Sequence, residues 1–235
     1  MNNRIWELDA FRGFCIIGVV IVHFIFDLTE LYGILHWDTP ALFRFVQLWG
    51  GTLFFLLSGV CATLSGRSLR RGFIVFGCGL VCTAVTAGMY LLGIAGQSII
   101  IRFGVLHCLG ICMILWAPFR GLPVWVLGVL CAVLIGLGFR FPDIQVESAW
   151  LFPLGLVHQG FVSSDYFPLL PNLGFFLLGS ILGRVLYRNK KTLFPQVDPQ
   201  IPAIRFLGFC GRQSLFIYLL HQPVLSLVCL VLSLL

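Results

Sequence analysis

Three histidines and one aspartate lie inside long apolar runs of this 235-residue chain, where an ionisable side chain is costly. They are His23 and Asp27 in the first run, His107 near the middle and His221 near the C-terminus. On a helix, His23 and Asp27 are four residues apart and share a face. A carboxylate beside an imidazole fixes its tautomer and raises its basicity, as a general base requires. A buried polar pair that joins two helices would have the same pattern.

The three histidines are expected at similar depths in a membrane. At about 1.5 Å per residue, His23 lies roughly 16 Å beyond Arg12, and His221 lies roughly 12 Å beyond Gln213. Contact with lipid would be costly for each of them, so we expect a shared interior and interpret the convergence as a site. Pro223 removes a helical donor beside His221 and favours a kink there. No two histidines have the spacing of a helical metal site, and no metal is expected.

Composition predicts the helices that must position these residues. Charged residues make up 10% of the chain and hydrophobic residues 59%, which excludes a soluble globule and a disordered chain. The fold class expected is all-α, a polytopic transmembrane bundle forming a single domain over residues 1–235. The first apolar run is expected to be a retained helix, since no signal-peptidase site follows it. We predict seven spans, at 11–31, 43–64, 72–95, 99–118, 122–139, 172–188 and 213–235.

Loop charges predict the orientation. With a cytoplasmic N-terminus, 12 of the 15 basic residues lie inside, and only Arg44, Arg102 and Arg140 lie outside. Segment 140–171 is then an outer loop with an interfacial or re-entrant piece at 150–154, and 184–212 is a basic inner loop. This distribution accounts for the net charge of +6 without nucleic acid. The basic surface suits either anionic lipid headgroups or the phosphates of a nucleotide-type ligand.

Several motifs carry a family resemblance. They are RIWELDAFRG at 4–13, VHF with FDL at 22–28, FFLLSG at 54–59, FGVLH at 103–107, and GRQSL through HQP at 211–223. In number and order they resemble the bacterial relatives of heparan-alpha-glucosaminide N-acetyltransferase, within a wider set of transmembrane acyltransferases. The resemblance covers nearly the whole chain.

The resemblance implies transfer of an acetyl or acyl group from cytoplasmic acyl-CoA to a sugar-like or other acceptor on the outer face, in a bacterial-type cytoplasmic membrane. Related sugar O-acyltransferases carry an Arg and a His with ten residues between them, as do Arg12 and His23 here. By the resemblance, His23 is the catalytic histidine and Asp27 its orienting partner. The further catalytic candidates are His107 and His221. The acetyl-CoA-binding candidates are Arg12, Ser58, Arg102, Arg184, Arg212, Ser214 and Tyr218.

Two other functions remain open on the sequence. A proton-coupled small-molecule transporter would use the histidines as a proton relay. Such transporters normally contain inverted repeats, and none is apparent in the sequence. A non-catalytic membrane scaffold would use the polar groups only for helix packing. The expected partners are acyl-CoA, a small-molecule or glycan acceptor and membrane lipid. Homo-oligomer formation and the choice between direct transfer and an acyl-enzyme stay open.

Overall fold

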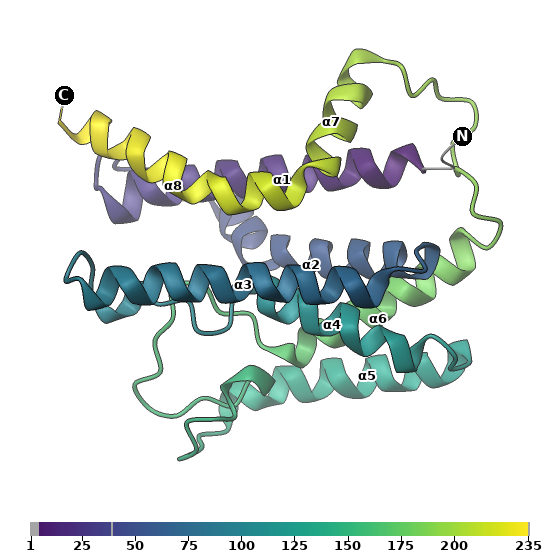
Figure 1. Cartoon of the computed structure of the whole chain (residues 1–235), viewed down its shortest axis with the longest axis horizontal. Helices are drawn as coiled ribbons and strands as arrows, with labels where there is room; N and C mark the ends of the chain where they lie inside the picture. The colour runs from purple at the N-terminus through teal and green to yellow at the C-terminus, as the bar shows by residue number, and fades with distance from the viewer. Residues whose placement is uncertain (1–4, 39, 235) are drawn as a thin grey trace. The chain divides into compact units, whose positions relative to one another are not determined.

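The computed structural model describes residues 5–38 and 40–234, and within them the protein is all-helical (Figure 1). The predicted fold class is therefore confirmed. A π-helical turn, Asp27–Leu31, continues the first helix, and short 3-10 turns lie between other helices. The eight α-helices of the described residues are α1 Trp6–Phe26, α2 Ala41–Leu64, α3 Ser68–Leu91, α4 Val105–Phe119, α5 Val124–Arg140, α6 Leu169–Leu186, α7 Pro202–Arg212 and α8 Ser214–Ser233.

Six helices of the described residues are long and apolar enough to cross a membrane, which makes this an integral membrane protein. They are α1 with its π-turn, α2, α3, α5, α6 and α8. The predicted span at 99–118 is wrong in its bounds, because α4 begins only at Val105. Its 15 residues cover about 22 Å, less than the roughly 30 Å hydrocarbon core. The cytoplasmic placement of the N-terminus stays a prediction.

The last third of the predicted inner loop 184–212 is helical and forms α7, while the inner placement of the segment stays a prediction. Pro202 sits in the first turn, where its missing N–H costs nothing and its fixed φ favours a helix. Eleven residues are too few to cross a membrane, so hydropathy gave no signal. One face of α7 is nonetheless built to pack, because Gly208, Cys210 and Gly211 are buried.

The chain divides into two compact units, which are described separately. In the unit Phe55–Arg188, α3 packs on α4, and α5 packs on α6. The end of α2 meets α6 at Gly59, where a Cβ would overlap the Phe176 carbonyl group. The segment 140–171, predicted to be an outer loop, holds two 3-10 turns, one of them at Phe152–Leu154 in the predicted interfacial piece. The prediction of one domain over the whole chain stays a prediction.

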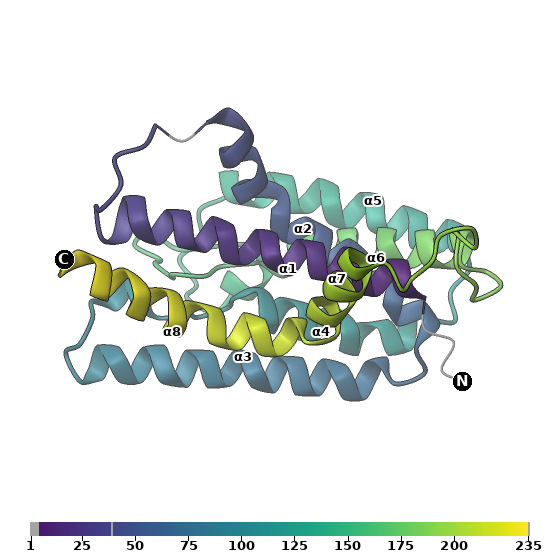
Figure 2. The ribbon, with the colours of Figure 1, turned by 90° about the horizontal axis from the view of Figure 1, so that it is seen from above.

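The other unit consists of the described residues before Phe55 and after Arg188. Here α7 and α8 both pack on α1, and Figures 1 and 2 show α8 running beside α1. Two glycines allow α1 and α7 to touch, because a Cβ at Gly13 would overlap the Leu207 carbonyl oxygen and one at Gly211 the Asp9 carbonyl oxygen. Further along, the Tyr32 hydroxyl donates to the Ser226 carbonyl at 3.1 Å and fixes the π-turn against α8.

Candidate active site

The contact between α1 and α8 brings two of the predicted histidines together. The ring centroids of His23 and His221 are 4.9 Å apart, with an interplanar angle of 72°. His221 is buried, with 8% of its surface exposed, whereas His23 is half-buried. The His23 ring is therefore the more exposed of the two. The contact between the rings brings two ionisable groups side by side, one in the last turn of α1 and one in α8.

One hydrogen bond fixes the tautomer of His221. Its Nδ1 lies 2.5 Å from the backbone carbonyl oxygen of Tyr218, one turn earlier in α8. A carbonyl oxygen only accepts, so Nδ1 carries the proton and Nε2 of the neutral ring holds a lone pair. That Nε2 atom is buried and has no hydrogen-bond partner among the described residues. Neutral His221 thus offers an acceptor, and its N–H is already engaged.

Asp27 is fully buried at the junction of α1 and the π-turn. Its two carboxylate oxygens each accept from Nε2 of Gln222, at 3.0 Å. The carboxylate also interacts electrostatically with His221. A buried carboxylate favours positive charge nearby, because an isolated buried anion is costly. The predicted partnership of Asp27 with His23 stays a prediction, while the hydrogen bonds of the structure direct Asp27 to α8.

His107 lies in the other unit, at the start of α4, and both of its ring nitrogens are engaged. Nδ1 accepts from the Gly104 N–H at 3.2 Å, so Nε2 carries the proton and donates to the Thr83 hydroxyl at 3.2 Å. The Thr83 hydroxyl in turn donates to the Ile101 carbonyl at 2.6 Å. These contacts cap the α4 N-terminus and tie it to α3. The predicted catalytic role of His107 stays a prediction, to which this geometry adds no support.

Two predicted acetyl-CoA ligands already bind backbone within the same unit. Arg184 donates to the carbonyl oxygens of Leu122 and Arg120, at 2.6 and 2.8 Å. Its guanidinium also lies 5.1 Å from the Trp116 ring centroid. Arg102 donates through Nε to the Val162 carbonyl at 3.1 Å. Arg184 therefore stabilises the C-terminal end of α4, and Arg102 stabilises the loop that contains Val162.

The remaining predicted ligands lie at several places. Arg12 Nη1 is 3.5 Å from the Asp9 carboxylate on α1. Arg212 is the last residue of α7. Ser214 and Tyr218 are in the first turns of α8. Ser58 is buried on α2, in the other unit. The unit that holds the histidine pair therefore also holds Arg12, Arg212, Ser214 and Tyr218.

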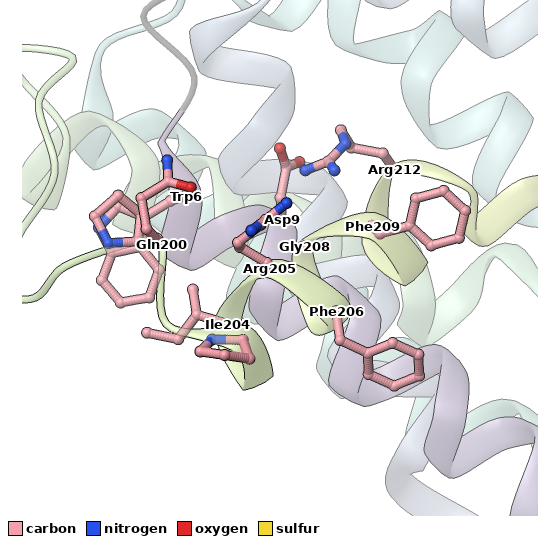
Figure 3. Close-up of a pocket in the computed structure, with 11 residues that line it drawn as sticks. Trp6, Asp9, Gln200, Ile204, Arg205, Phe206, Gly208, Phe209 and Arg212 are labelled. Atoms are coloured by element: carbon pink, nitrogen blue, oxygen red, sulfur yellow. The ribbon is translucent and has the colours of Figure 1, made fainter.

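A cavity of about 650 Å³ opens between the start of α1 and α7 (Figure 3). Arg205 and Arg212 supply its positive charge, and Asp9 supplies a carboxylate. In Figure 3 both arginine side chains are directed toward Asp9. Aromatic surface comes from Trp6, Phe206 and Phe209, all of which line the cavity. Guanidinium groups bind phosphate and aromatic faces stack on planar rings, so this lining suits a phosphorylated aromatic ligand.

The Glu7 carboxylate, next to Trp6 of the cavity lining, ties the start of α1 to residues 192 and 193. Thr192 donates its hydroxyl to one carboxylate oxygen at 2.9 Å, and the Leu193 N–H donates to the other at 2.8 Å. Phe194 then packs on Trp6, with ring centroids 6.4 Å apart. The segment before α7 is thus tied to the start of α1. Among the described residues, no group of three or more metal-ligating side chains is close enough to hold a metal ion.

The apolar spans define an integral membrane protein, and two of its helices bring a pair of histidines into contact. The chain belongs to the heparan-alpha-glucosaminide N-acetyltransferase catalytic family, whose model matches residues 4–223. The predicted resemblance is thereby confirmed. Membership implies a membrane acetyltransferase that uses acetyl-CoA. No curated protein and no solved structure matches the chain.

Sequence reasoning missed several residues of this unit. Gln222 follows His221 directly, and its amide donates to Asp27. The sequence alone gave no sign that this glutamine does more than pack between helices. Trp6 and Arg205 line the cavity, and the available signal was the amphipathic pattern after Pro202. Glu7 belongs to the motif at 4–13, but the sequence suggested no role for it.

Proposed function

We propose that this protein transfers an acetyl group from cytoplasmic acetyl-CoA to a hydroxyl or amine on the opposite side of the membrane. The His23–His221 pair is the observation that carries the proposal, because two acid–base groups sit side by side within spanning helices. Family membership supports acetyl-CoA as the donor. The direction of transfer rests on the charge distribution of the loops.

The cavity at the start of α1 is the proposed docking site for the nucleotide end of acetyl-CoA. Arg205 and Arg212 bind phosphate, and the Trp6 indole supplies a face for adenine. Asp9 accepts from ribose hydroxyls or the adenine amine. A volume of about 650 Å³ is in the range of ordinary small-molecule sites.

Helix lengths support this placement. Ser214 begins α8 two residues after Arg212, and it precedes His221 by seven residues, a rise of roughly 10 Å along α8. The pantetheine arm has about a dozen bonds between its phosphate and its sulfur, which equals about four extended residues, or roughly 14 Å. The arm is therefore long enough for a thioester to reach the histidine pair from a phosphate bound at Arg212.

His23 is the proposed general base, because it is the more accessible ring of the pair. It takes the proton of the acceptor while the acceptor's oxygen or nitrogen attacks the acetyl carbonyl carbon. The carbon–sulfur bond then breaks, and the leaving thiolate takes the proton from His23. The buried Asp27 carboxylate stabilises the transient positive charge on the histidine pair.

The test uses sealed proteoliposomes and acetyl-CoA labelled either in the acetyl group or in the adenine. We expect acetyl label on an acceptor trapped inside the vesicles, while the adenine label stays outside. A panel of amino sugars, sugar alcohols and simple amines identifies the acceptor class. Uptake of a solute with protons and no acetyl transfer would establish a transporter and overturn the proposal. Absence of both acetyl transfer and solute flux would indicate a non-catalytic scaffold and would also overturn the proposal.

A further inference from the structure

Nε2 of His221 is a buried acceptor that lacks a donor. The Nδ1–H bond to the Tyr218 carbonyl leaves Nε2 with its lone pair, and no described residue donates to it. Buried polar atoms in native proteins nearly always have a partner, and exceptions cluster at functional sites. The neighbouring amide oxygen of Gln222 is unpartnered in the same way.

His23 is placed to supply the missing donor. In an N–H···N hydrogen bond the nitrogens are about 2.9 Å apart, and each lies about 1.1 Å from its ring centre, so the centroids are roughly 5 Å apart. The observed separation of His23 and His221 is 4.9 Å. The torsion that turns a histidine ring about its Cβ–Cγ bond is broad, so a turn of the ring completes the bond without moving the helices.

We propose that His221, and not Asp27, is the positioning residue for His23. One ring N–H of His23 donates to Nε2 of His221, which leaves the lone pair of the other nitrogen facing the acceptor. The inference rests on the proposed function and assigns the orienting group within the same site. It replaces the partnership that sequence spacing alone suggested.

The contacts of Asp27 favour this assignment. Both of its oxygens receive hydrogen bonds from Gln222, which anchors the carboxylate to α8. Gln222 directly follows His221, whose ring lies against that of His23. The contacts therefore run from His23 to His221 on α8, and Asp27 is anchored to the next residue of the same helix.

The proton balance is simple. The acceptor's proton moves to the free nitrogen of His23 as the acceptor bonds to the acetyl carbon, and the thiolate takes it when the carbon–sulfur bond breaks. In between, His23 is a cation whose second N–H donates to Nε2 of His221. The lone pair there and the Asp27 carboxylate behind it both favour that cation.

Two substitutions separate positioning from packing. His221→Gln keeps a side chain that can accept a hydrogen bond, whereas His221→Phe keeps a ring that packs on His23 but accepts none. We expect His221→Phe to lower kcat by about 100-fold or more and His221→Gln by less than about tenfold. The KM for acetyl-CoA should change little in either. A kcat of His221→Phe equal to or higher than that of His221→Gln would overturn the inference.

Nuclear magnetic resonance tests the same hydrogen bond without requiring catalysis. In protein labelled with ¹⁵N-histidine, we expect a bare Nε2 on His221 and a through-bond coupling between it and a His23 nitrogen. Both signals should disappear in His221→Phe and His221→Gln, which assigns them. A protonated Nε2 on His221 would overturn the inference even if the protein proves inactive. Absence of acetyl transfer together with the expected coupling would overturn the proposed function alone.

Discussion

The contact between α1 and α7 makes a sharp prediction about Gly13. An added Cβ would overlap the carbonyl oxygen of Leu207 and lie 2.7 Å from its carbonyl carbon. Carbon atoms in contact normally stay about 3.5–4.0 Å apart, so the two backbones must separate by roughly 1 Å. Neither atom belongs to a side chain that can rotate away. Because Gly211 packs equally closely on Asp9, the separation disturbs the whole contact.

Gly13→Ala should therefore destabilise the protein by about 3 kcal/mol, the upper part of the range for overpacking. For a chain of this length, that lowers Tm by roughly 6–12 °C. Gly18→Ala is the matched control on the same helix, because nothing lies within 4 Å of its added Cβ. Alanine at Gly18 should leave stability unchanged or raise it by about 0.5–1 kcal/mol.

Thermal unfolding of both variants in one detergent, followed by tryptophan fluorescence, gives the comparison. The KM for acetyl-CoA should rise in Gly13→Ala only, since the cavity lies between the same two helices. Equal Tm values for Gly13→Ala and the natural protein would refute the packing of α1 on α7 from which the cavity was argued.

Three further predictions concern the cavity and the segment between α5 and α6. Arg205→Ala should raise the KM for acetyl-CoA by about tenfold or more with kcat little changed, through loss of a phosphate contact. Lys191→Ala, outside the cavity lining, is the control. Equal changes of KM in the two variants would contradict the docking site. Glu7→Gln should raise the same KM by about three- to tenfold, because weaker hydrogen bonds then hold residues 192 and 193, and with them Phe194 against Trp6 of the cavity lining. An unchanged KM would show that these hydrogen bonds do not support binding. Burial raises the pKa of Tyr166 to about 12, so the folded state keeps a proton that the unfolded state loses near pH 10, and stability present below pH 10 should fall as pH rises toward 12. Tyr166→Phe should flatten that fall in alkaline unfolding curves, and an identical slope in both proteins would contradict the burial of this hydroxyl.

Sequence predicted the long helices because hydropathy acts over some twenty residues and needs no knowledge of neighbours. It failed at α4, where a cap built from His107, Gly104 and Thr83 delays the helix start. It failed again at α7, which is too short and too polar for a hydropathy signal. Hydropathy over a window of some twenty residues detects neither a local cap nor a short polar helix.

The site shows the same division. Sequence placed His23 and His221 at matching depths, because rise per residue on a helix is fixed. It could not tell that His107 caps a helix or that Arg184 donates to backbone carbonyls, since each role depends on tertiary partners. It also paired Asp27 with His23 from their four-residue spacing, whereas Gln222 on another helix donates to that carboxylate.

The central claim is that His23 performs acetyl transfer within the membrane. The most direct measurement is single-turnover transfer of labelled acetyl from acetyl-CoA by His23→Ala protein in nanodiscs. His36→Ala, which changes an exposed histidine outside the spans, is the control. We predict that His23→Ala abolishes transfer while Tm and acetyl-CoA binding stay near those of the natural protein, and that His36→Ala transfers normally. Full transfer by His23→Ala would contradict the account.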